Sequence, residues 1–272
     1  MITDQQGLQA FQPQREFFIG IDSDGCAFDT MEIKHKECFI PNIIRCWDLQ
    51  AVSKYARDAA EFVNLYSKWR GINRWPALLM VFDLLAEHPD VQRRKARLPQ
   101  VPTLREWEKT ETKLGEPALK AALANTGDPV LEKALGWSQA VNTSIADMVH
   151  HIPPFPFVQE SLAALERTAD IMVVSQTPTE ALNREWAEHD IAKYAHAICG
   201  QEMGSKTEHL KYGAGTKYPS GHVLMIGDAP GDLQAARANG FLLFPVNPGA
   251  EDASWQLFYE EAIDKFLRGA YG

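Results

Sequence analysis

The stretch FFIGIDSDGCAFDT, residues 17–30, decides the fold class of this chain. The apolar run that opens it, residues 16–21, is typical of a parallel strand buried on both faces. The run ends abruptly at two aspartates, Asp22 and Asp24, and then a glycine. Ligands of open α/β sheets bind beyond the carboxyl ends of the strands. The stretch therefore predicts an α/β sheet with a functional site where its first strand ends.

Four further short apolar runs follow the first strand. They cover residues 170–175, 195–200, 222–227 and 241–246. Helical patterns separate them, and strands that alternate with helices form doubly wound sheets. We therefore predict an α/β fold with a Rossmann-like, doubly wound parallel sheet. Its core covers residues 1–29, with the first strand and the aspartates, and residues 153–272, which end in a C-terminal helix.

The segment between the first two strands has a different pattern. Residues 30–152 contain no convincing strand but several helix signals, such as apolar positions at helical spacing in residues 52–69. The predicted apolar face of that run comprises Val52, Tyr55, Ala59, Phe62, Val63 and Tyr66. The proline-rich stretch HHIPPFPF, 150–157, marks the return to the sheet. We predict an all-helical cap domain, residues 30–152, inserted into the α/β core.

The C-terminal stretch SWQLFYEEAIDKFL, residues 254–267, predicts one amphipathic helix. Its apolar face comprises Trp255, Phe258, Tyr259, Ile263, Phe266 and Leu267. The opposite face is acidic, with Glu260, Glu261 and Asp264, whereas helices that lie on membranes carry basic residues there. The pattern favours packing of this helix against the α/β core.

Composition restricts the classes of partner. The chain has 272 residues, of which 45% are hydrophobic, and a formal net charge of −9. An acidic balance disfavours nucleic-acid binding, which requires basic surfaces. The N-terminus has no apolar segment of signal-peptide length, no run approaches a membrane span, and the four cysteines have no metal-binding spacing. We expect a cytoplasmic protein with free thiols that binds no nucleic acid and no membrane; the sequence does not indicate its oligomeric state.

A second pair of aspartates follows another predicted strand. In VLMIGDAPGDLQAARANG, residues 223–240, Asp228 ends the strand and Asp232 opens a helix. The carboxyl ends of parallel strands lie at one edge of a sheet, so this pair can converge with Asp22 and Asp24. Clustered carboxylates repel one another, and a hard divalent cation such as Mg²⁺ resolves the repulsion. The cluster indicates a Mg²⁺ site suited to holding a phosphoryl oxygen against a nucleophile.

Two other strand ends carry residues suited to anion binding. Ser175 ends the second strand, and residues 177–180 form a T-x-x-E capping box that predicts a helix N-terminus. Further on, Ser205 and Glu208 form another predicted box, which places Lys206 in the first helical turn. A lysine there is unfavourable for the helix dipole, which indicates a function such as neutralising a phosphate.

Taken in order, these residues resemble the four motifs of the haloacid dehalogenase-like hydrolases. The motifs are Asp22-x-Asp24-Gly25, Ser175, Lys206 and Gly227-Asp228-x-x-x-Asp232. The resemblance covers about residues 15–30 and 152–250, and the helical insertion is similar to the cap that some members carry between motifs one and two. Asp24 resembles the phosphoryl-transfer members, because dehalogenase members lack this aspartate. Cys26 departs from the threonine or valine that is usual in the family.

The resemblance implies a role for each motif residue. Asp22 would be the nucleophile that forms an aspartyl-phosphate, and Asp24 would act as general acid and then as general base. Ser175 and Lys206 would hold the phosphoryl oxygens. The implied Mg²⁺ ligands are the Asp22 carboxylate, the Asp24 backbone carbonyl, Asp228 and Asp232.

Four further residues are predicted to contact the substrate. Gly25 and Gln176 directly follow residues of the first and second motifs. Arg70 and Arg74 lie in YSKWRGINRWP, residues 66–76, where arginines suit recognition of an anionic substrate. The same segment equally fits a solvated turn with buried tryptophans, and the sequence leaves both interpretations open.

The functional prediction is a Mg²⁺-dependent phosphatase that acts on a small phosphorylated metabolite through an aspartyl-phosphate. The alternatives are a phosphomutase or other phosphotransferase acting on a sugar phosphate, and a non-catalytic binding protein that retains the fold. A glycosyltransferase D-x-D would leave Gly227–Asp232 and Lys206 unexplained. An EF-hand is excluded, because its calcium loop requires glycine at the sixth position.

Overall fold

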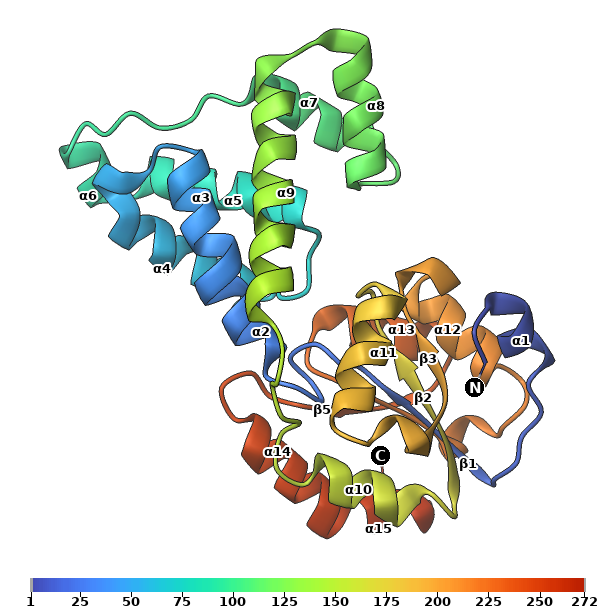
Figure 1. Cartoon of the computed structure of the whole chain (residues 1–272). Helices are drawn as coiled ribbons and strands as arrows, with labels where there is room; N and C mark the ends of the chain where they lie inside the picture. Colours follow the sequence, from blue (N-terminus) through green and yellow to red (C-terminus); the bar gives the residue numbers. More distant parts are fainter. Residues whose placement is uncertain (1, 272) are drawn as a thin grey trace. The chain divides into compact units, whose positions relative to one another are not determined.

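The chain forms two compact units in the computed structural model, which describes residues 2–271 (Figure 1). The first, here called the α/β core, contains the residues up to Met31 and those from His151 onward. The second, the helical unit, comprises Glu32–His150. Among the described residues, no helix is both long and apolar enough to cross a membrane.

A five-stranded sheet forms the centre of the α/β core, with strand order β3-β2-β1-β4-β5. The strands are β1 (Phe17–Ile21), β2 (Ala169–Val174), β3 (Ala195–Cys199), β4 (Val223–Gly227) and β5 (Leu242–Pro245). Every neighbouring pair is parallel. The doubly wound parallel sheet and the five strands expected from the apolar runs are therefore confirmed.

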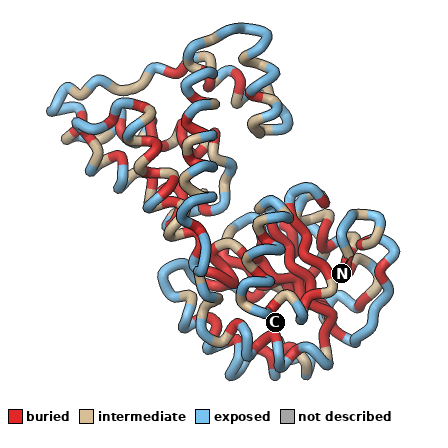
Figure 2. The backbone as a smooth tube through the Cα atoms, viewed as in Figure 1, coloured by how far each residue is buried: buried red, intermediate tan, exposed pale blue. Residues whose placement is uncertain are grey.

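Helices cover both faces of the sheet, as the alternation of side chains along β1 requires. Ile19 and Ile21 pack with one set of helices and Phe18 with the other. The first set is α10 (Val158–Leu165), α11 (Thr179–Glu188), α14 (Glu251–Leu257) and α15 (Ile263–Leu267). The second set is α1 (Gln5–Ala10), α12 (Lys206–Gly213) and α13 (Pro230–Ala238). Strands β1, β2 and β4 are buried along their whole length and β3 along almost all of it, whereas the edge strand β5 is only partly buried (Figure 2).

The strand register sets where the functional residues lie. Ile21, the last residue of β1, pairs with Val173 of β2 and Ile226 of β4. The three central strands therefore end at nearly the same level. The residues that follow them lie at one edge of the sheet: Asp22, Ser175 and Asp228.

The helical unit contains no strand among its residues 32–150, all of which the structure describes. After α2 (Thr30–Ile33) and a π-helical turn (Lys34–Phe39), its helices are α3 (Ile40–Cys46), α4 (Ser53–Asn64), α5 (Arg74–Glu87), α6 (Pro89–Arg93), α7 (Pro102–Thr110), α8 (Glu116–Thr126) and α9 (Pro129–Met148). Trp75 packs edge-on against both Trp107 and Trp137, with ring centroids 5.4 and 5.7 Å apart. These aromatic contacts form the centre of the core of the helical unit.

The predicted apolar face of α4 is partly wrong. Phe62 and Tyr66 are 46% and 48% exposed, whereas the buried stripe runs through Ala56, Ala60 and Val63. α4 packs against α5, and two alanines at helical spacing allow the closest approach of the two backbones. The small side chains, rather than the aromatic ones, therefore decide which face is buried.

The C-terminal helix also departs from its predicted face. A π-helical turn, Phe258–Ala262, separates α14 from α15. Such a turn adds a residue to one helical turn and rotates the face that follows it. Trp255, Phe258 and Phe266 are buried as predicted, whereas Tyr259 is 42% exposed.

α12 contains a buried imidazole, that of His209, which is 1% exposed. Burial lowers the pKa of His209 to about 4. In the unfolded chain a histidine has a pKa near 6.5. Between these values the unfolded chain binds a proton that the folded chain does not, so the free energy of unfolding falls as the pH falls from about 6.5 to 4.

Replacing His209 should remove its contribution to the pH dependence of the free energy of unfolding. In urea unfolding, we expect the wild type to lose about 2 kcal/mol more stability than His209→Leu between pH 7 and pH 4.5. The difference between the two proteins isolates His209 from the carboxylates that titrate in the same range. His150→Gln, at an exposed position, should behave like the wild type. Equal losses in the wild type and His209→Leu would contradict the prediction.

Candidate active site

Asp22 is held in place by the strand that precedes it. Its backbone N–H donates to the carbonyl of Ile226 at 2.9 Å, which extends the pairing of β1 with β4 by one residue. Its carboxylate is buried, 4% exposed, and Oδ1 accepts a hydrogen bond of 2.8 Å from the backbone N–H of Ser23. The sheet therefore fixes both the position and the direction of this side chain.

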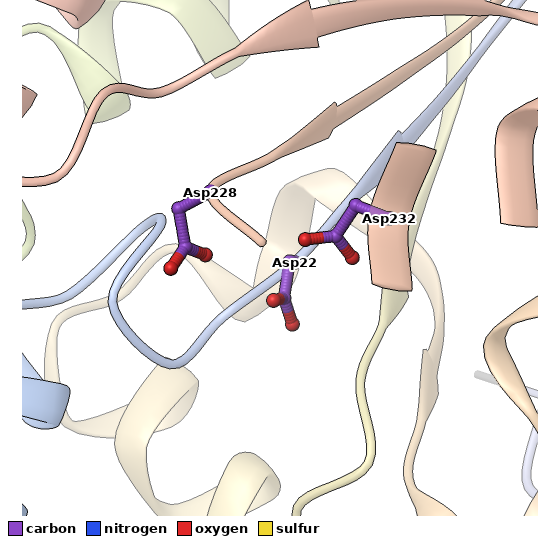
Figure 3. Close-up of side chains that lie close together, drawn as sticks. All are labelled: Asp22, Asp228 and Asp232. Atoms are coloured by element: carbon purple, nitrogen blue, oxygen red, sulfur yellow. The ribbon is translucent and has the colours of Figure 1, made fainter. Parts of the chain in front are cut away.

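Asp228 and Asp232 come together with Asp22. One carboxylate oxygen from each of the three lies within 4.8 Å of the others. Figure 3 shows the three side chains gathered beyond the ends of β1 and β4, with Asp232 on α13. All three residues are buried. The predicted convergence is confirmed for these three aspartates, whereas the fourth, Asp24, is not part of the group.

Gly227 allows this approach. A Cβ atom at this position would lie 2.4 Å from both Cβ and Cγ of Asp232, closer than atoms can pack. Only glycine therefore lets the first turn of α13 come this near to the end of β4. Asp232 also holds its own helix, because Oδ2 accepts a hydrogen bond of 3.0 Å from the N–H of Ala229.

Lys206 is the cation of the cluster. Its Nζ donates to Asp22 Oδ2 and to Asp232 Oδ1, both at 2.7 Å. It is the first residue of α12, and the predicted capping box is present: Ser205 Oγ accepts from the N–H of Glu208, and the Glu208 carboxylate accepts from the N–H of Ser205. The capped helix start thus directs a lysine toward the carboxylates.

The electrostatics of the cluster follow from burial. Burial raises the pKa of Asp22 well above its ordinary value, the Lys206 ammonium opposes this, and the carboxylates of Asp232 and Asp228 add to it. Burial alone would lower the pKa of Lys206, but Asp22 and Asp232 raise it above the usual value. Lys206 thus bonds to two of the three carboxylates, while the carboxylates of Asp228 and Asp232 oppose the ionisation of Asp22.

The donor set fits a divalent cation. Three carboxylates within 4.8 Å of one another supply the hard oxygen ligands that Mg²⁺ requires. A divalent charge would also offset the repulsion among these carboxylates. The residues that could hold the ion are Asp22, Asp228 and Asp232.

Asp24 lies two residues beyond Asp22, and two threonines hold its carboxylate. The hydroxyl of Thr30 donates to Oδ1, and that of Thr177 donates to Oδ2 at 3.5 Å. The tight turn after Asp24 depends on Gly25, whose φ of 77° lies in the left-handed region and whose N–H donates to the carbonyl of Phe28. Gly25 thus has a structural role in the turn, and its predicted contact with substrate stays a prediction.

Ser175 follows β2 and is buried, 1% exposed. Its N–H donates to the carbonyl of Cys199, and its Oγ accepts from the N–H of Thr177 at 3.2 Å. The predicted capping box at residues 177–180 is wrong, because α11 begins at Thr179 after Pro178. Thr177 lies before the helix, and its hydroxyl points to Asp24 instead.

The loops after β2 and β3 are tied together. The side-chain amide of Gln176 donates to the carbonyl of Gly204 at 2.9 Å, and the N–H of Gln201 donates to the carbonyl of Thr177 at 3.1 Å. The Glu202 carboxylate accepts from both the N–H and the hydroxyl of Thr179. Gln176 therefore links the loop of Ser175 to the loop before Lys206, and its predicted contact with substrate stays a prediction.

Arg70 and Arg74 belong to the helical unit. Arg70 is 5% exposed and donates to the carbonyl of Leu65 at 3.0 Å. Arg74 donates to Ser138 at 2.7 Å and to Asn142 at 2.9 Å. Both guanidinium groups thus have partners within their own unit, and a role in substrate recognition stays a prediction.

Several contacts of the site are not visible in the sequence. Thr30 and Thr177 contact Asp24, although they lie on opposite sides of the helical insertion. Two buried tryptophans on different helices, Trp186 and Trp255, donate hydrogen bonds to the loop that carries Asp22. A threonine at or shortly before the start of a helix carries no signal for such a contact, and an apolar pattern does not show where an indole N–H points.

Comparisons with known proteins bear on the same residues. A family model described as haloacid dehalogenase-like hydrolase matches residues 103–244, a range that includes Ser175, Lys206, Asp228 and Asp232. Asp22 and Asp24 lie outside the matched range. A search of curated proteins found no match.

Several solved structures are similar to this chain, and one of them has a TM-score above 0.5. A putative phosphoglycolate phosphatase from Lactobacillus delbrueckii subsp. bulgaricus has a TM-score of 0.51 and 14% identity, with 95% of this chain and 100% of that chain covered. A haloacid dehalogenase-like hydrolase from Streptococcus pneumoniae has a TM-score of 0.45 and 14% identity, with coverages of 88% and 90%. A putative beta-phosphoglucomutase from Thermotoga maritima has a TM-score of 0.39 and 15% identity, with 84% of each chain covered.

Removing Lys206 should destabilise the protein when no metal is bound. In Lys206→Met, the buried carboxylates of Asp22 and Asp232 lose their bond to an ammonium group, and we expect a loss of about 2–4 kcal/mol in urea unfolding at pH 7.5 with a chelator present. The loss should shrink at pH 5, because burial raises the pKa of Asp22 and its protonation removes the repulsion. Lys211→Met, at an exposed position of the same helix, is the matched control and should change stability by less than about 0.5 kcal/mol. Equal stability of the two variants would show that Lys206 does not compensate the cluster.

Proposed function

The chain belongs to the haloacid dehalogenase-like hydrolases, and we propose that it is a Mg²⁺-dependent phosphatase acting on a small phosphorylated metabolite through an aspartyl-phosphate. The observation that carries this proposal is the arrangement around Asp22: a buried carboxylate bonded to the Lys206 ammonium and grouped with Asp228 and Asp232. Two residues away lies a second carboxylate, that of Asp24, which accepts hydrogen bonds from the hydroxyls of Thr30 and Thr177.

The first half-reaction assigns different tasks to the two carboxylates. The Asp22 carboxylate attacks the phosphorus atom of the substrate, and the bond between phosphorus and the ester oxygen breaks. Asp24 in its protonated form gives the proton to the leaving oxygen. The Ser175 hydroxyl and the Lys206 ammonium bind the phosphoryl oxygens, whose charge they offset.

The second half-reaction restores the protein. The Asp24 carboxylate takes a proton from water, and the water oxygen attacks the phosphorus of the aspartyl-phosphate. The bond to Asp22 breaks, and inorganic phosphate leaves. The hydroxyls of Thr30 and Thr177, which donate to the Asp24 carboxylate, orient it for this step.

A Mg²⁺ ion held by Asp22, Asp228 and Asp232 would bind a phosphoryl oxygen and neutralise charge on it. For the helical unit we propose the role of a cap that governs access to the site and selects the substrate. We further propose that the protein acts in the cytoplasm, with no nucleic acid or membrane as partner.

A phosphomutase is the second candidate. It would use the same Asp22 and Asp24 but would pass the phosphoryl group to a sugar hydroxyl instead of to water. A non-catalytic binding protein is the alternative of a different class. The presence of Asp22, Asp24, Ser175 and Lys206 together argues against it, because a protein that only binds needs no proton-transferring carboxylate.

A panel of phosphomonoesters tests the proposal. With Mg²⁺ present, we expect the wild type to release inorganic phosphate from at least one small substrate, in a panel that includes 2-phosphoglycolate and hexose 1-phosphates. Asp22→Asn should abolish release because an amide cannot attack phosphorus, whereas Asp252→Asn, at an exposed position, should keep full activity. Conversion of a hexose 1-phosphate into its isomer without phosphate release would support the mutase. Absence of both reactions would support a binding protein.

Metal binding is tested without turnover. We expect Mg²⁺ to raise the thermal unfolding midpoint of the wild type, because a ligand at a hundred times its Kd stabilises the folded state by about 2.7 kcal/mol. Asp228→Asn removes one charged ligand and should lose most of the shift, while Asp252→Asn should retain it. An unchanged wild-type midpoint at millimolar Mg²⁺ would refute the metal site.

A further inference from the structure

Ser23 lies between the two catalytic aspartates and is completely buried, with 0% of its surface exposed. Its hydroxyl is the centre of a chain of hydrogen bonds. The indole Nε1 of Trp186 donates to Ser23 Oγ at 2.9 Å, and Ser23 Oγ donates to Glu185 Oε2 at 2.9 Å. Both partners are neighbours on α11, so this helix holds the serine side chain from two directions.

The backbone of Ser23 holds the reactive part of the loop. Its N–H donates to Asp22 Oδ1 at 2.8 Å. Its carbonyl accepts from the N–H groups of Cys26, Ala27 and Phe28 at 3.3, 2.9 and 3.1 Å. One residue therefore touches the nucleophilic carboxylate on one side and closes the turn that follows Asp24 on the other.

The hydroxyl group suits this position chemically. A buried indole N–H requires an acceptor, and a carboxylate requires a donor. A hydroxyl serves both at once, because it has one proton to donate and lone pairs to accept with. The bond to Glu185 is charge-assisted, which fixes the direction of the Ser23 proton and leaves a lone pair for Trp186.

The support behind the serine is rigid. Trp186 is fully buried and packs edge-on against Phe28, with ring centroids 5.9 Å apart. In the same core cluster, Trp255 of α14 donates to the carbonyl of Cys26 at 2.7 Å. Two tryptophans thus hold the same loop through one hydrogen bond each.

On the basis of the proposed function, we infer that Ser23 is a positioning residue: through Trp186 and Glu185, helix α11 sets the direction from which the Asp22 carboxylate meets the phosphoryl group. The hydroxyl itself touches no reacting atom. Its effect reaches the reaction through the peptide group between Asp22 and Ser23, whose N–H binds Asp22 Oδ1. A displacement of the order of 1 Å at a reacting group lowers rates by about a hundredfold.

Ser23→Ala and Trp186→Phe test this role in the full-length protein. With a substrate from the panel, we expect kcat to fall about 10- to 100-fold in Ser23→Ala while KM stays within about twofold. Trp186→Phe should likewise lower kcat and leave KM nearly unchanged. The double variant should be no slower than Ser23→Ala alone, because both changes break the same chain of hydrogen bonds. Glu185→Gln, which keeps an acceptor oxygen, should retain more activity than Glu185→Ala.

Binding of trifluoroberyllate, a mimic of the phosphoryl group on a carboxylate, gives a readout without turnover. With Mg²⁺ present, Ser23→Ala should bind it about tenfold more weakly than the wild type, because the Asp22 carboxylate loses its fixed direction. Ser161→Ala removes another fully buried hydroxyl, on α10, and Trp137→Phe removes a buried indole in the helical unit. Both controls should keep the wild-type kcat and trifluoroberyllate affinity, whatever they do to the thermal unfolding midpoint.

The outcomes separate this inference from the proposed function. An active wild type with full kcat in Ser23→Ala or Trp186→Phe would overturn the inference alone. Additive losses of kcat in the double variant would also overturn it. Equal losses of kcat in the controls Ser161→Ala and Trp137→Phe would do the same. A wild type that neither releases nor transfers phosphate nor binds trifluoroberyllate would overturn the proposed function and the inference with it. If Ser23→Ala fails to fold, the kcat values of Trp186→Phe, Glu185→Gln and Glu185→Ala still test the inference.

Discussion

The site at the edge of the sheet depends on one electrostatic constraint: three buried carboxylates and the Lys206 ammonium group lie close together. Asp22 and Asp232 are both bonded to Lys206, and Asp228 lies beside them. In a buried environment such charges are tolerated only when partners lie at hydrogen-bond distance. The sheet register, the close approach at Gly227 and the capped start of α12 can be understood as the conditions that bring these groups to such distances.

The same groups serve the fold and the chemistry. One oxygen of Asp232 accepts from the backbone at the start of α13, and the other binds Lys206. The N–H of Asp22 continues the pairing of β1 with β4, while its carboxylate is the proposed nucleophile. A site built in this way keeps carboxylates that repel one another, which lowers stability and favours the binding of a cation.

The loop of residues 22–30 combines two kinds of support. Asp22 is held by the sheet and by the peptide of Ser23, which α11 holds through Trp186 and Glu185. Asp24 is held by hydroxyl groups, those of Thr30 and Thr177. A nucleophile benefits from a fixed direction, whereas a group that gives and takes protons needs partners that adapt to both protonation states. The two environments match the two tasks that we propose.

The sequence by itself determined the parallel sheet, because continuous apolar runs between helices have few other ways to be buried. It also determined the acidic cluster, since residues after parallel strands must come out at one edge. It could not determine which face of α4 is buried, where a π-helical turn rotates the C-terminal helix, or what holds Asp24 and Ser23. Those features depend on how closely helices pack, and on hydrogen bonds such as that from Trp186 to Ser23, which joins residues 163 positions apart. Only the tertiary structure brings such groups within about 3 Å of each other, the distance at which a hydrogen bond forms.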